Sequence, residues 1–301
     1  MSALICGSFA YDNIMVFPDQ FKNHILADKV HMLNVSFLVP EMRREFGGCA
    51  GNIAYNLNML GGDALPMGTV GSDFAEYAEW MDKQGISRKH VHIKSEQFTA
   101  QAFITTDIDD NQITAFHPGA MNLAHEISIK EAQDVTLAIV SPDGREGMLQ
   151  HAQQLADAGI PFIFDPGQGL PMFDGDELIA FAEQASYIAV NDYEAQLLMN
   201  KTGLTQQQLA QYVDALIITR GAQGSQIYTH GECLEIPCYP AEAVVDPTGC
   251  GDAYRAGLLY GIMQGFDWQK TGHIAAKLGA LKIAHPGTQN HVFSPEDILN
   301  D

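Results

Sequence analysis

Asp246-Pro-Thr-Gly-Cys-Gly-Asp252 is the most informative stretch of this sequence of 301 residues. Gly249 and Gly251 allow backbone angles and close approaches that other residues do not. Apolar residues then recur at helical spacing from Ala253 onward, which predicts that the loop opens a helix. The N–H groups of residues 249–252 would then converge at the positive end of the helix dipole. We therefore expect an anion site there, suited to a phosphate group during its transfer.

Asp252, which ends this stretch, has two interpretations. An acidic residue in the first turn of any helix complements the helix dipole. A carboxylate beside a bound phosphate can instead act as a general base and accept the proton of a substrate hydroxyl. Cys250 also has two interpretations: it is a small residue that fits a tight loop, or a thiol activated at the helix N-terminus that bound nucleotide would protect from alkylation.

Outward from this stretch, short β-rich runs alternate with helical patterns. The expected strands are residues 3–7, 64–70, 135–140, 161–165, 187–190 and 215–219. The expected helices are residues 49–60, 75–84 (capped by Ser72), 145–158, 175–184, 192–200 and 205–213. Alternation at this spacing predicts an α/β fold, with a central, mostly parallel sheet and helices on both faces.

Two stretches, about 9–45 and 90–117, break the alternation. They contain alternating apolar and polar residues, and Asp109-Asp110-Asn111 is typical of a hairpin turn. We read both as antiparallel strands of a small β-sheet lid, the alternative being an extension of the main sheet. Because the two lid segments are separated in sequence, we expect residues 1–301 to form a single folding unit.

The charge balance excludes two classes of partner. Sixteen Lys and Arg residues against 37 Asp and Glu residues give a formal net charge of −21, whereas nucleic acids and anionic membranes require clustered cations. No apolar run is long enough for a membrane span, and the first residues do not resemble a signal peptide. Five scattered cysteines favour a reducing, cytoplasmic location. Cys233 and Cys238 could form half of a zinc site, but no second pair accompanies them.

DPTGCGD resembles the signature of the ribokinase (PfkB-type) family of small-molecule kinases, and its continuation is most similar to adenosine kinases of the bacterial type. Other tracts in the same order are similar to that group: Gly7-Ser8 with Asp12, 33–38, 47–52, 116–121, 191–194 and 287–289. The resemblance implies a ribokinase-like fold with a β-sheet lid. It also implies phosphorylation of the 5′-hydroxyl of adenosine to AMP by ATP, a purine-salvage reaction. Asp252 would be the general base, and Gly249, Cys250 and Gly251 would form the anion hole.

For the nucleoside, the resemblance implies four contacts near the first strand and the helix that follows the lid: Ser8, Asp12, Gly48 and Asn52. Asp12 would hold two sugar hydroxyls, although a loop aspartate that starts a turn is the simpler interpretation. Gly47, Gly48 and Asn52 can equally be a turn that precedes a helix. All of these contacts are expectations from the resemblance.

Phe103 and Phe116 are candidates to stack on a flat base, or else are core aromatics of the lid. Gln168 is a candidate for contact with the base or the ribose. The bacterial adenosine kinases carry two glutamines there, whereas this chain has Gln168-Gly169. That departure leaves the purine preference open.

For ATP, the chain has neither a P-loop nor a dinucleotide fingerprint. The resemblance instead implies nucleotide contacts from Asn191, Glu194, Thr219, Gly221 and Gly224. Glu194 would order Mg²⁺ through water, and K⁺ is a further candidate cofactor. A helix cap at Asn191 and a β-turn at Thr219–Gly224 are the simpler interpretations. Arg220 and Arg255 are expected near the phosphate, or else in surface ion pairs.

The lid of bacterial adenosine kinases also implies a homodimer, with Ser36 and Phe37 reaching the partner's site. Within the same class, a broader nucleoside kinase (for inosine, guanosine or cytidine) or a sugar kinase would keep every phosphate residue. From a different class, a catalytically silent binding regulator on the same fold remains an alternative.

Overall fold

The computed structural model describes residues 1–25, 32, 34–109 and 111–300. Within these residues, the strands form two sheets, one of nine strands and one of four. The large sheet consists of β1 (Ser2–Cys6), β4 (Asp63–Gly71), β5 (His90–Lys94), β8 (Val135–Val140), β9 (Phe162–Phe164), β10 (Tyr187–Asn191), β11 (Ala215–Thr219), β12 (Ser225–Thr229) and β13 (Glu232–Ile236). The small sheet, called the lid sheet below, consists of β2 (Ala10–Val16), β3 (Glu41–Gly47), β6 (Ala100–Thr106) and β7 (Gln112–His117).

The helices lie between these strands in the chain. The α-helices are α1 (Cys49–Met59), α2 (Ala75–Gln84), α3 (Arg145–Ala158), α4 (Gly175–Gln184), α5 (Asp192–Thr202), α6 (Gln206–Leu209), α7 (Cys250–Met263), α8 (Trp268–Ile283) and α9 (Pro295–Leu299). The 3₁₀ helices are η1 (Phe21–Asn23), η3 (Gly119–Glu126), η4 (Ile129–Glu131), η5 (Gly167–Met172) and η6 (Gly221–Gln223).

The large sheet has the order β13-β12-β11-β10-β9-β8-β1-β4-β5. All neighbours from β5 to β11 pair in parallel, and β12 and β13 add to one edge in antiparallel. Successive strand residues point to opposite faces, so Ala3 and Ile5 join one buried cluster and Leu4 and Cys6 join another. Helices α1, α2, α7 and α8 cover the first face, and α3, α4 and α5 cover the second. This arrangement confirms the predicted architecture.

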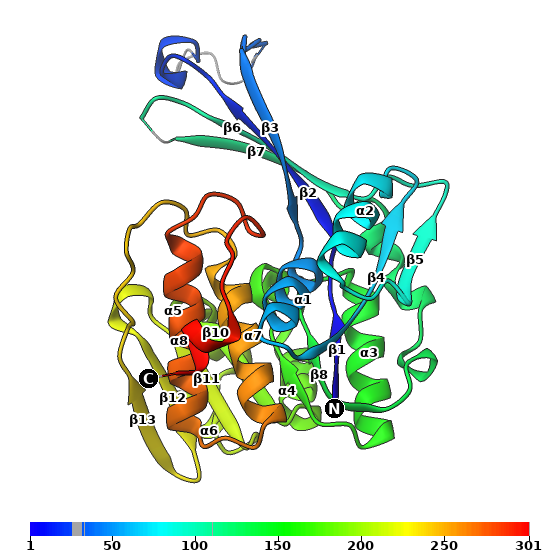
Figure 1. Ribbon diagram of the computed structural model, residues 1–301, viewed down its shortest axis with the longest axis vertical. Coiled ribbons are helices and arrows are strands. Elements are labelled where there is room, and N and C mark those ends of the chain that lie inside the picture. Colours follow the sequence, from blue (N-terminus) through cyan, green and yellow to red (C-terminus); the bar gives the residue numbers. More distant parts are fainter. Residues whose placement is uncertain (26–31, 33, 110, 301) are drawn as a thin grey trace.

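The lid sheet stands out from the body at the side where β1 ends (Figure 1). Strand β2 lies between β3 and β6, antiparallel to β3 but parallel to β6, and β7 pairs with β6 in antiparallel. The prediction of antiparallel strands throughout was therefore wrong at the β2–β6 pair, which joins segments far apart in the sequence.

Three local predictions need correction. The range 90–117 begins too early for the lid, because β5 pairs in parallel with β4 in the large sheet. Within the stretch of about 9–45 that was read as antiparallel strands, residues 34–39 form no strand and β3 begins only at residue 41, while 26–31 and 33 lie outside the described residues. Phe37 lies outside any strand and packs on Phe17 and Phe21, so its apolar neighbours reflect this small cluster rather than a strand.

One further correction concerns a helix end, whereas the predicted hairpin turn lies between the antiparallel strands β6 and β7 as expected. Ser72 does not cap α2, which begins after Phe74, because the Ser72 hydroxyl donates to the carbonyl of Gln97. At the β6–β7 hairpin, Asp107 Oδ1 accepts the N–H groups of Asp109 and Asn111, each at 2.9 Å, while Asp110 lies outside the described residues. At these two positions, short polar side chains therefore bond to nearby backbone groups and do not start a helix.

Among the described residues, the structure contains no helix with the length and hydropathy needed to span a bilayer.

Candidate active site

A cavity of about 530 Å³ opens at the carboxyl ends of the parallel strands, beneath the lid sheet. Residues just past β1, β8 and β9, and the last residues of β10 and β11, contribute Ser8, Pro142, Asp165, Asn191 and Thr219. Ligands of open α/β sheets bind at this edge. Its other lining residues are Ala10, Asp12, Gly48, Cys49, Asn52, Ala102, Phe116, Gly167, Gln168, Glu194, Gly221, Thr248, Gly249, Gly251, Asp252, Arg255 and Thr288. We call it the polar cavity.

The predicted anion-binding loop lies against this cavity. Gly249 caps α7 with φ +79°, a left-handed conformation that favours glycine, and a Cβ there would lie 3.0 Å from Thr288. The N–H groups of Gly251 and Asp252 have no acceptor among the described residues, as expected for a first helical turn. Cys250 departs from the prediction, because its N–H donates to the carbonyl of Pro247 at 3.2 Å and its side chain lies outside the polar cavity.

Of the two interpretations of Cys250, the activated thiol is not supported by the structure. The pKa of this thiol is raised to about 11, mainly by burial and in smaller part by the charges of Asp246 and Asp252. Lys282 lowers that pKa in part, but does not offset burial. The structure therefore favours the interpretation of Cys250 as a small residue that fits the loop.

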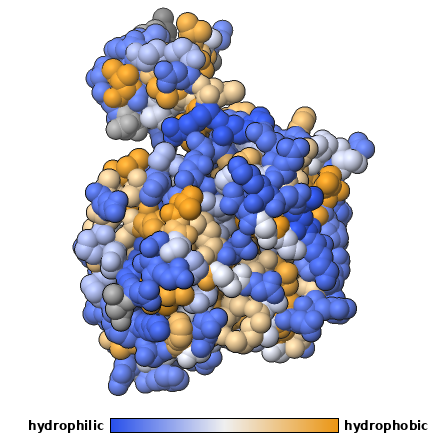
Figure 2. Space-filling view, viewed as in Figure 1, coloured by the Kyte–Doolittle hydropathy of each residue, from blue (hydrophilic) through white to orange (hydrophobic). Residues whose placement is uncertain are grey.

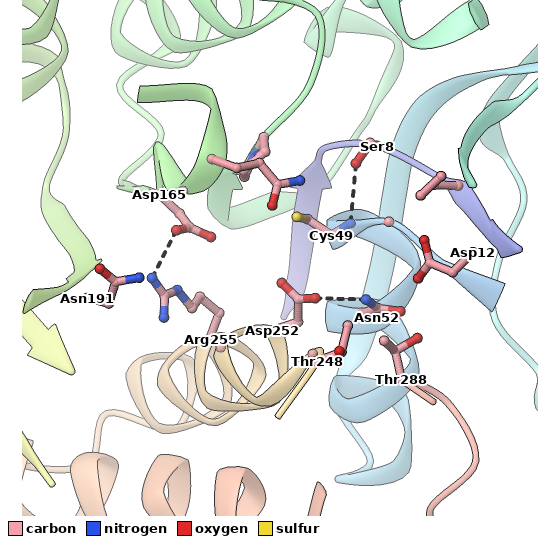
Figure 3. A pocket seen from close by; sticks show the side chains of 18 of the residues that line it. Ser8, Asp12, Cys49, Asn52, Asp165, Asn191, Thr248, Asp252, Arg255 and Thr288 are labelled. Atoms are coloured by element: carbon pink, nitrogen blue, oxygen red, sulfur yellow. Dashed lines mark hydrogen bonds and ion pairs between the residues drawn. The ribbon is translucent and has the colours of Figure 1, made fainter. Parts of the chain in front are cut away.

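Asp252 lies between Asn52 on one side and Arg255 on the other (Figure 3). Its Oδ2 accepts a hydrogen bond of 2.8 Å from Asn52 Nδ2. Burial raises the pKa of Asp252 to about 6, with a further rise from Asp165, against the lowering effect of the Asn52 hydrogen bond and of Arg255. A carboxylate with this pKa can accept a proton near neutral pH.

The orientation of the Asn52 amide is fixed by residues that sequence reasoning did not place in the site. Gln289 Nε2 donates to Asn52 Oδ1 at 2.9 Å and also to the hydroxyl of Tyr77. Trp80 Nε1 in turn donates to Gln289 Oε1 at 2.9 Å. Because the oxygen of Asn52 is occupied, its NH₂ group must face Asp252. Gln289 belongs to a tract quoted for its resemblance, but no spacing in the sequence pointed to this contact.

Arg255 is buried, so its interpretation as a surface ion pair was wrong. Its Nη2 donates to Asp165 Oδ1 at 3.0 Å and to the carbonyl of Ala189 at 3.2 Å, and it lies 3.9 Å from Glu194 Oε2. Figure 3 shows Arg255 and Asp165 pointing toward each other across the cavity. Asp165 was quoted only as part of a turn, although an acid directly after a strand end was a usable signal.

Arg220, by contrast, is not part of the cavity. Its guanidinium pairs with Glu235 on the antiparallel edge of the large sheet. The structure therefore supports the surface ion pair for Arg220 and the site contact for Arg255. Arg220 directly follows β11 and Arg255 lies in α7, and their neighbours in space decide which of them lines the cavity.

On the opposite side of the cavity, Asp12 and Ser8 lie beside the turn that precedes α1. Gly48 has φ +87°, and a Cβ there would lie 2.5 Å from the carbonyl oxygen of Ser8. Ser8 Oγ accepts the N–H of Cys49 at 3.3 Å. Burial raises the pKa of Asp12 to about 6, with further contributions from Glu45 and Asp246. The turn interpretation and the ligand interpretation are thus compatible here.

The two aromatic candidates lie on opposite faces of the lid sheet. Asp12, Ala102 and Phe116 are cross-strand neighbours, and all three line the cavity. Phe103 pairs with Ala115, one position further along, so it points to the other face and does not line the cavity. Gln168 lies in the cavity with Phe116, as predicted.

A second cavity of about 500 Å³ lies beside the first and shares Thr219, Gly221 and Gly251 with it. Its other lining residues are Ala222, Gly224, Ser225, Cys238, Tyr239, Pro240, Ala241, Val244, Cys250, Tyr254, Ala276, Gly279, Ala280 and Ile283. Most of these are small or apolar, and we call it the apolar cavity. Gly224 has φ +81° and a Cβ there would lie 2.1 Å from the carbonyl oxygen of Ile236, so this position requires glycine.

Besides Phe103, two more predicted residues lie outside the polar and the apolar cavity. Ser36 and Phe37 lie in the lid segment between η1 and β3, away from the cavity-lining residues. Their predicted role in a partner's site stays a prediction.

Glu194 and Asn191 form a capping box at the start of α5, in which Asn191 N–H donates to Glu194 Oε2 at 2.8 Å. Both also line the polar cavity, so the helix-cap interpretation does not exclude the ligand interpretation. Among the described residues, no three His, Cys, Asp or Glu side chains are grouped to hold a metal ion. Mg²⁺ in phosphate sites takes one or two carboxylates, several waters and the substrate phosphates. Glu194 Oε1 accepts no hydrogen bond from the described residues, so this carboxylate fits a water-mediated role.

Comparisons with known proteins agree with this geometry. A family model described as pfkB family carbohydrate kinase matches residues 11–295. A nucleoside kinase of Methanocaldococcus jannaschii is 33% identical over 261 residues, which are 86% of each chain. Two solved structures of the Burkholderia thailandensis nucleoside kinase are similar to this chain. The complex with inosine has 56% identity and a TM-score of 0.89 over 98% of this chain and 95% of that one. The complex with ADP and inosine has 58% identity and a TM-score of 0.87 over 98% and 93%.

Proposed function

The chain belongs to the pfkB family of carbohydrate kinases and is a kinase, and we propose that it transfers phosphate from ATP to the 5′-hydroxyl of purine nucleosides. The leading prediction from sequence was adenosine, with a broader nucleoside kinase or a sugar kinase as the alternative. Because the similar kinases are named for nucleosides in general, and one of them was crystallised with inosine, we propose a range that includes both adenosine and inosine.

The observation that carries the proposal is the position of Asp252. Its carboxylate lines the polar cavity next to Gly251, which lines both cavities. A nucleoside in the polar cavity and a nucleotide in the apolar cavity would therefore meet at the start of α7. That is where an acceptor hydroxyl and a migrating phosphate group must come together.

In the proposed mechanism, Asp252 accepts the proton of the 5′-hydroxyl as this oxygen attacks the γ-phosphate. The N–H groups of Gly251 and Asp252 and the positive end of α7 stabilise the charge on the transferred phosphate group. Arg255 holds Asp165 and Glu194 in place at the cavity wall. Mg²⁺, bound through water at Glu194, would neutralise phosphate charge.

The ribose and the base would be held by different elements. Asp12 and Asn52 offer a carboxylate and an amide for the ribose hydroxyls, and Phe116 offers an aromatic face for the base. Gln168 is the amide on the base side of the cavity. An amide both donates and accepts, so one side chain can face the 6-amino group of adenine or the 6-oxo group of hypoxanthine after rotation. This property supports a broad purine range.

The proposal is tested by measuring ADP release with adenosine, inosine, guanosine, cytidine, ribose and fructose 6-phosphate. We expect activity with the purine nucleosides and a loss of it with 2′-deoxy and 3′-deoxy analogues, because Asp12 would lose a hydroxyl partner. Activity with ribose or fructose 6-phosphate but with no nucleoside would contradict the proposal and favour a sugar kinase.

We further propose that residues 1–301 form one kinase domain whose lid sheet makes a homodimer. Figure 2 shows hydrophobic side chains among hydrophilic ones on the projecting lid. Val16, Met42, Phe103 and Ile113 are exposed apolar residues of its strands, and a second copy could cover them. We expect a sedimentation mass of twice 32.8 kDa, and a mass near 32.8 kDa at working concentration would contradict the dimer.

A further inference from the structure

Lys282, in the last turn of α8, is a fully buried lysine. Its ammonium group donates to two backbone carbonyls, that of Asp246 at 2.7 Å and that of His285 at 3.1 Å. Within the described part of the chain, no carboxylate lies within ion-pair distance of it. A buried ammonium held only by neutral carbonyl oxygens is unusual, because burying a charge is costly.

These two carbonyls belong to the segments that hold the anion-binding loop. Asp246 is its first residue, and its N–H donates to the carbonyl of Ile283. Its carboxylate accepts the N–H of Thr248 and the N–H of Gly287, each at 2.9 Å. The ammonium group of Lys282 donates to the backbone carbonyl of Asp246. The N–H, the carboxylate and the carbonyl of Asp246 therefore all have hydrogen-bond partners.

The position of this charge matters for a polyanionic substrate. The polar cavity contains Asp12, Asp165, Glu194 and Asp252, and its cation Arg255 already pairs with Asp165. Lys282 lies behind the first residue of α7, where its charge acts on the pKa of Cys250. Its positive charge is not neutralised by an ion pair and supports the same helix end that would bind phosphate.

We propose that Lys282 is a positioning residue that serves as a built-in monovalent cation for the anion-binding loop, so that the enzyme works without K⁺. The inference rests on the proposed function and concerns the control of that same site. K⁺ prefers neutral oxygen ligands, which the carbonyls of Asp246 and His285 provide. The ammonium group already occupies these carbonyls, and a second cation beside it would be repelled. The K⁺ expected from the family resemblance therefore does not fit this chain.

Burial lowers the pKa of Lys282, while the charge of Asp246 raises it. These opposing effects on the pKa agree with an ammonium group that is stabilised by backbone carbonyls and a nearby charge, and not by a direct ion pair.

The first test uses the wild-type protein. Initial rates with ATP as a sodium salt and inosine or adenosine are compared in potassium, sodium and choline chloride at equal ionic strength. The product nucleotide is quantified by chromatography, because coupling enzymes can themselves require K⁺. We expect rates within about twofold across the three salts, and a tenfold or larger rise with K⁺ would overturn the proposal. Absence of turnover with every nucleoside in every salt would instead count against the proposed function.

The second test replaces Lys282 by methionine, which has similar length and no charge. We expect kcat to fall roughly 10- to 100-fold in choline chloride with the nucleoside KM within about twofold, because the loop loses its support and not its ribose contacts. K⁺ or NH₄⁺ should raise the kcat of Lys282→Met at least about fivefold over its value in choline chloride, since either ion can bind the carbonyls that the ammonium group has left. Wild-type kcat in Lys282→Met, or a loss in a folded variant that neither ion restores, would overturn the proposal.

Lys277→Met is the matched control. Lys277 lies on the same helix, and its ammonium group also meets two backbone carbonyls, those of Ile298 and Asn300, away from the anion-binding loop. Its ratio of rates in potassium and choline chloride should remain that of the wild type. An equal potassium response in both variants would overturn the proposal.

A readout independent of activity is thermal unfolding. Potassium chloride should raise the Tm of Lys282→Met by about 2 °C relative to choline chloride and leave the wild type unchanged. A wild-type Tm that rises with K⁺ would overturn the proposal. If Lys282→Met does not fold in any salt, the wild-type responses decide.

Discussion

The polar and apolar cavities lie side by side and share Thr219, Gly221 and Gly251, yet they are built from different chemistry. The polar cavity has four carboxylates, one guanidinium and several amides, and hydrogen bonds hold Asp252, Asp165, Asn52 and Arg255 in place. The apolar cavity is formed by glycine, alanine and other apolar residues, with few polar side chains. Under the proposed function, side chains would recognise the reacting groups of the acceptor, whereas the shape of the apolar cavity would recognise the nucleotide base.

The strongest test of this division is Asp252→Asn. We expect kcat to fall about 10³- to 10⁴-fold with nucleoside affinity largely intact, because the amide keeps the shape but cannot take the proton. Steady-state kinetics and nucleoside calorimetry measure the two quantities. Asp176→Asn is the control, since Asp176 is an exposed acid in the first turn of α4 and only complements its dipole. Equal, small effects in both variants would reduce Asp252 to a dipole-complementing acid.

The pH profile tests whether two buried carboxylates of the polar cavity act together. Asp252 and Asp12 each have a pKa raised to about 6, and both are proposed to work as anions. Protonation on lowering the pH therefore removes activity. We expect log kcat/KM to fall with a slope approaching 2 below pH 5, and kcat/KM at pH 5 to be about 100-fold below its plateau. Asp12→Asn should reduce the slope to 1, and a flat profile down to pH 5 would contradict the assignment.

Filling the apolar cavity should affect only the nucleotide. A Cβ at Gly279 on α8 would meet its nearest neighbour, the carbonyl oxygen of Cys250, at 3.8 Å, so the helix accepts a side chain there. Gly279→Leu should raise the KM for ATP by roughly tenfold and leave the nucleoside KM within about twofold. The same rise in both KM values would mean that the two cavities do not bind separate substrates.

The smallest expected effect distinguishes the two faces of the lid sheet. Phe116→Ala should raise the KM for adenosine by about fivefold, as expected for the loss of aromatic stacking. Phe103→Ala should leave that KM within about twofold, because Phe103 points away from the cavity. Both variants are assayed at a protein concentration at which they have the same oligomeric state as the wild type, because Phe103 is one of the residues proposed to contact a second copy. A larger effect of Phe103→Ala on KM would contradict the register-based assignment.

Patterns that depend on neighbours in sequence predicted much of this structure. The predicted helix at 145–158 and the strands at 135–140 and 215–219 agree with α3, β8 and β11. The loop Asp246–Asp252 also opens α7 as expected, because its glycines and the apolar spacing act locally. Gly48, Asn52 and Gln168, expected at the nucleoside, line the polar cavity together with Asn191 and Glu194, which were expected at the nucleotide.

Contacts between distant segments were not predictable in the same way. Phe103 and Phe116 look equivalent in sequence, and only the pairing register of β6 with β7 turns one of them away from the cavity. Arg220 and Arg255 likewise differ only in what surrounds them: Glu235 at a sheet edge for one, and buried Asp165 and Ala189 for the other. The links from Gln289 to Asn52 and from Lys282 to Asp246 span 237 and 36 residues.

The amino-acid sequence was enough to predict an α/β chain with a glycine-rich loop that opens a helix and carries an acid, because the helix start, the glycine turn and the strand–helix alternation are governed by short-range sterics and periodicity. The folded chain was needed to see that Asp252 bonds Asn52, that Arg255 and not Arg220 lines the cavity, and that Lys282 contacts Asp246. Those outcomes depend on burial and on hydrogen bonds between segments that meet only after the sheet has assembled, and no local pattern records them.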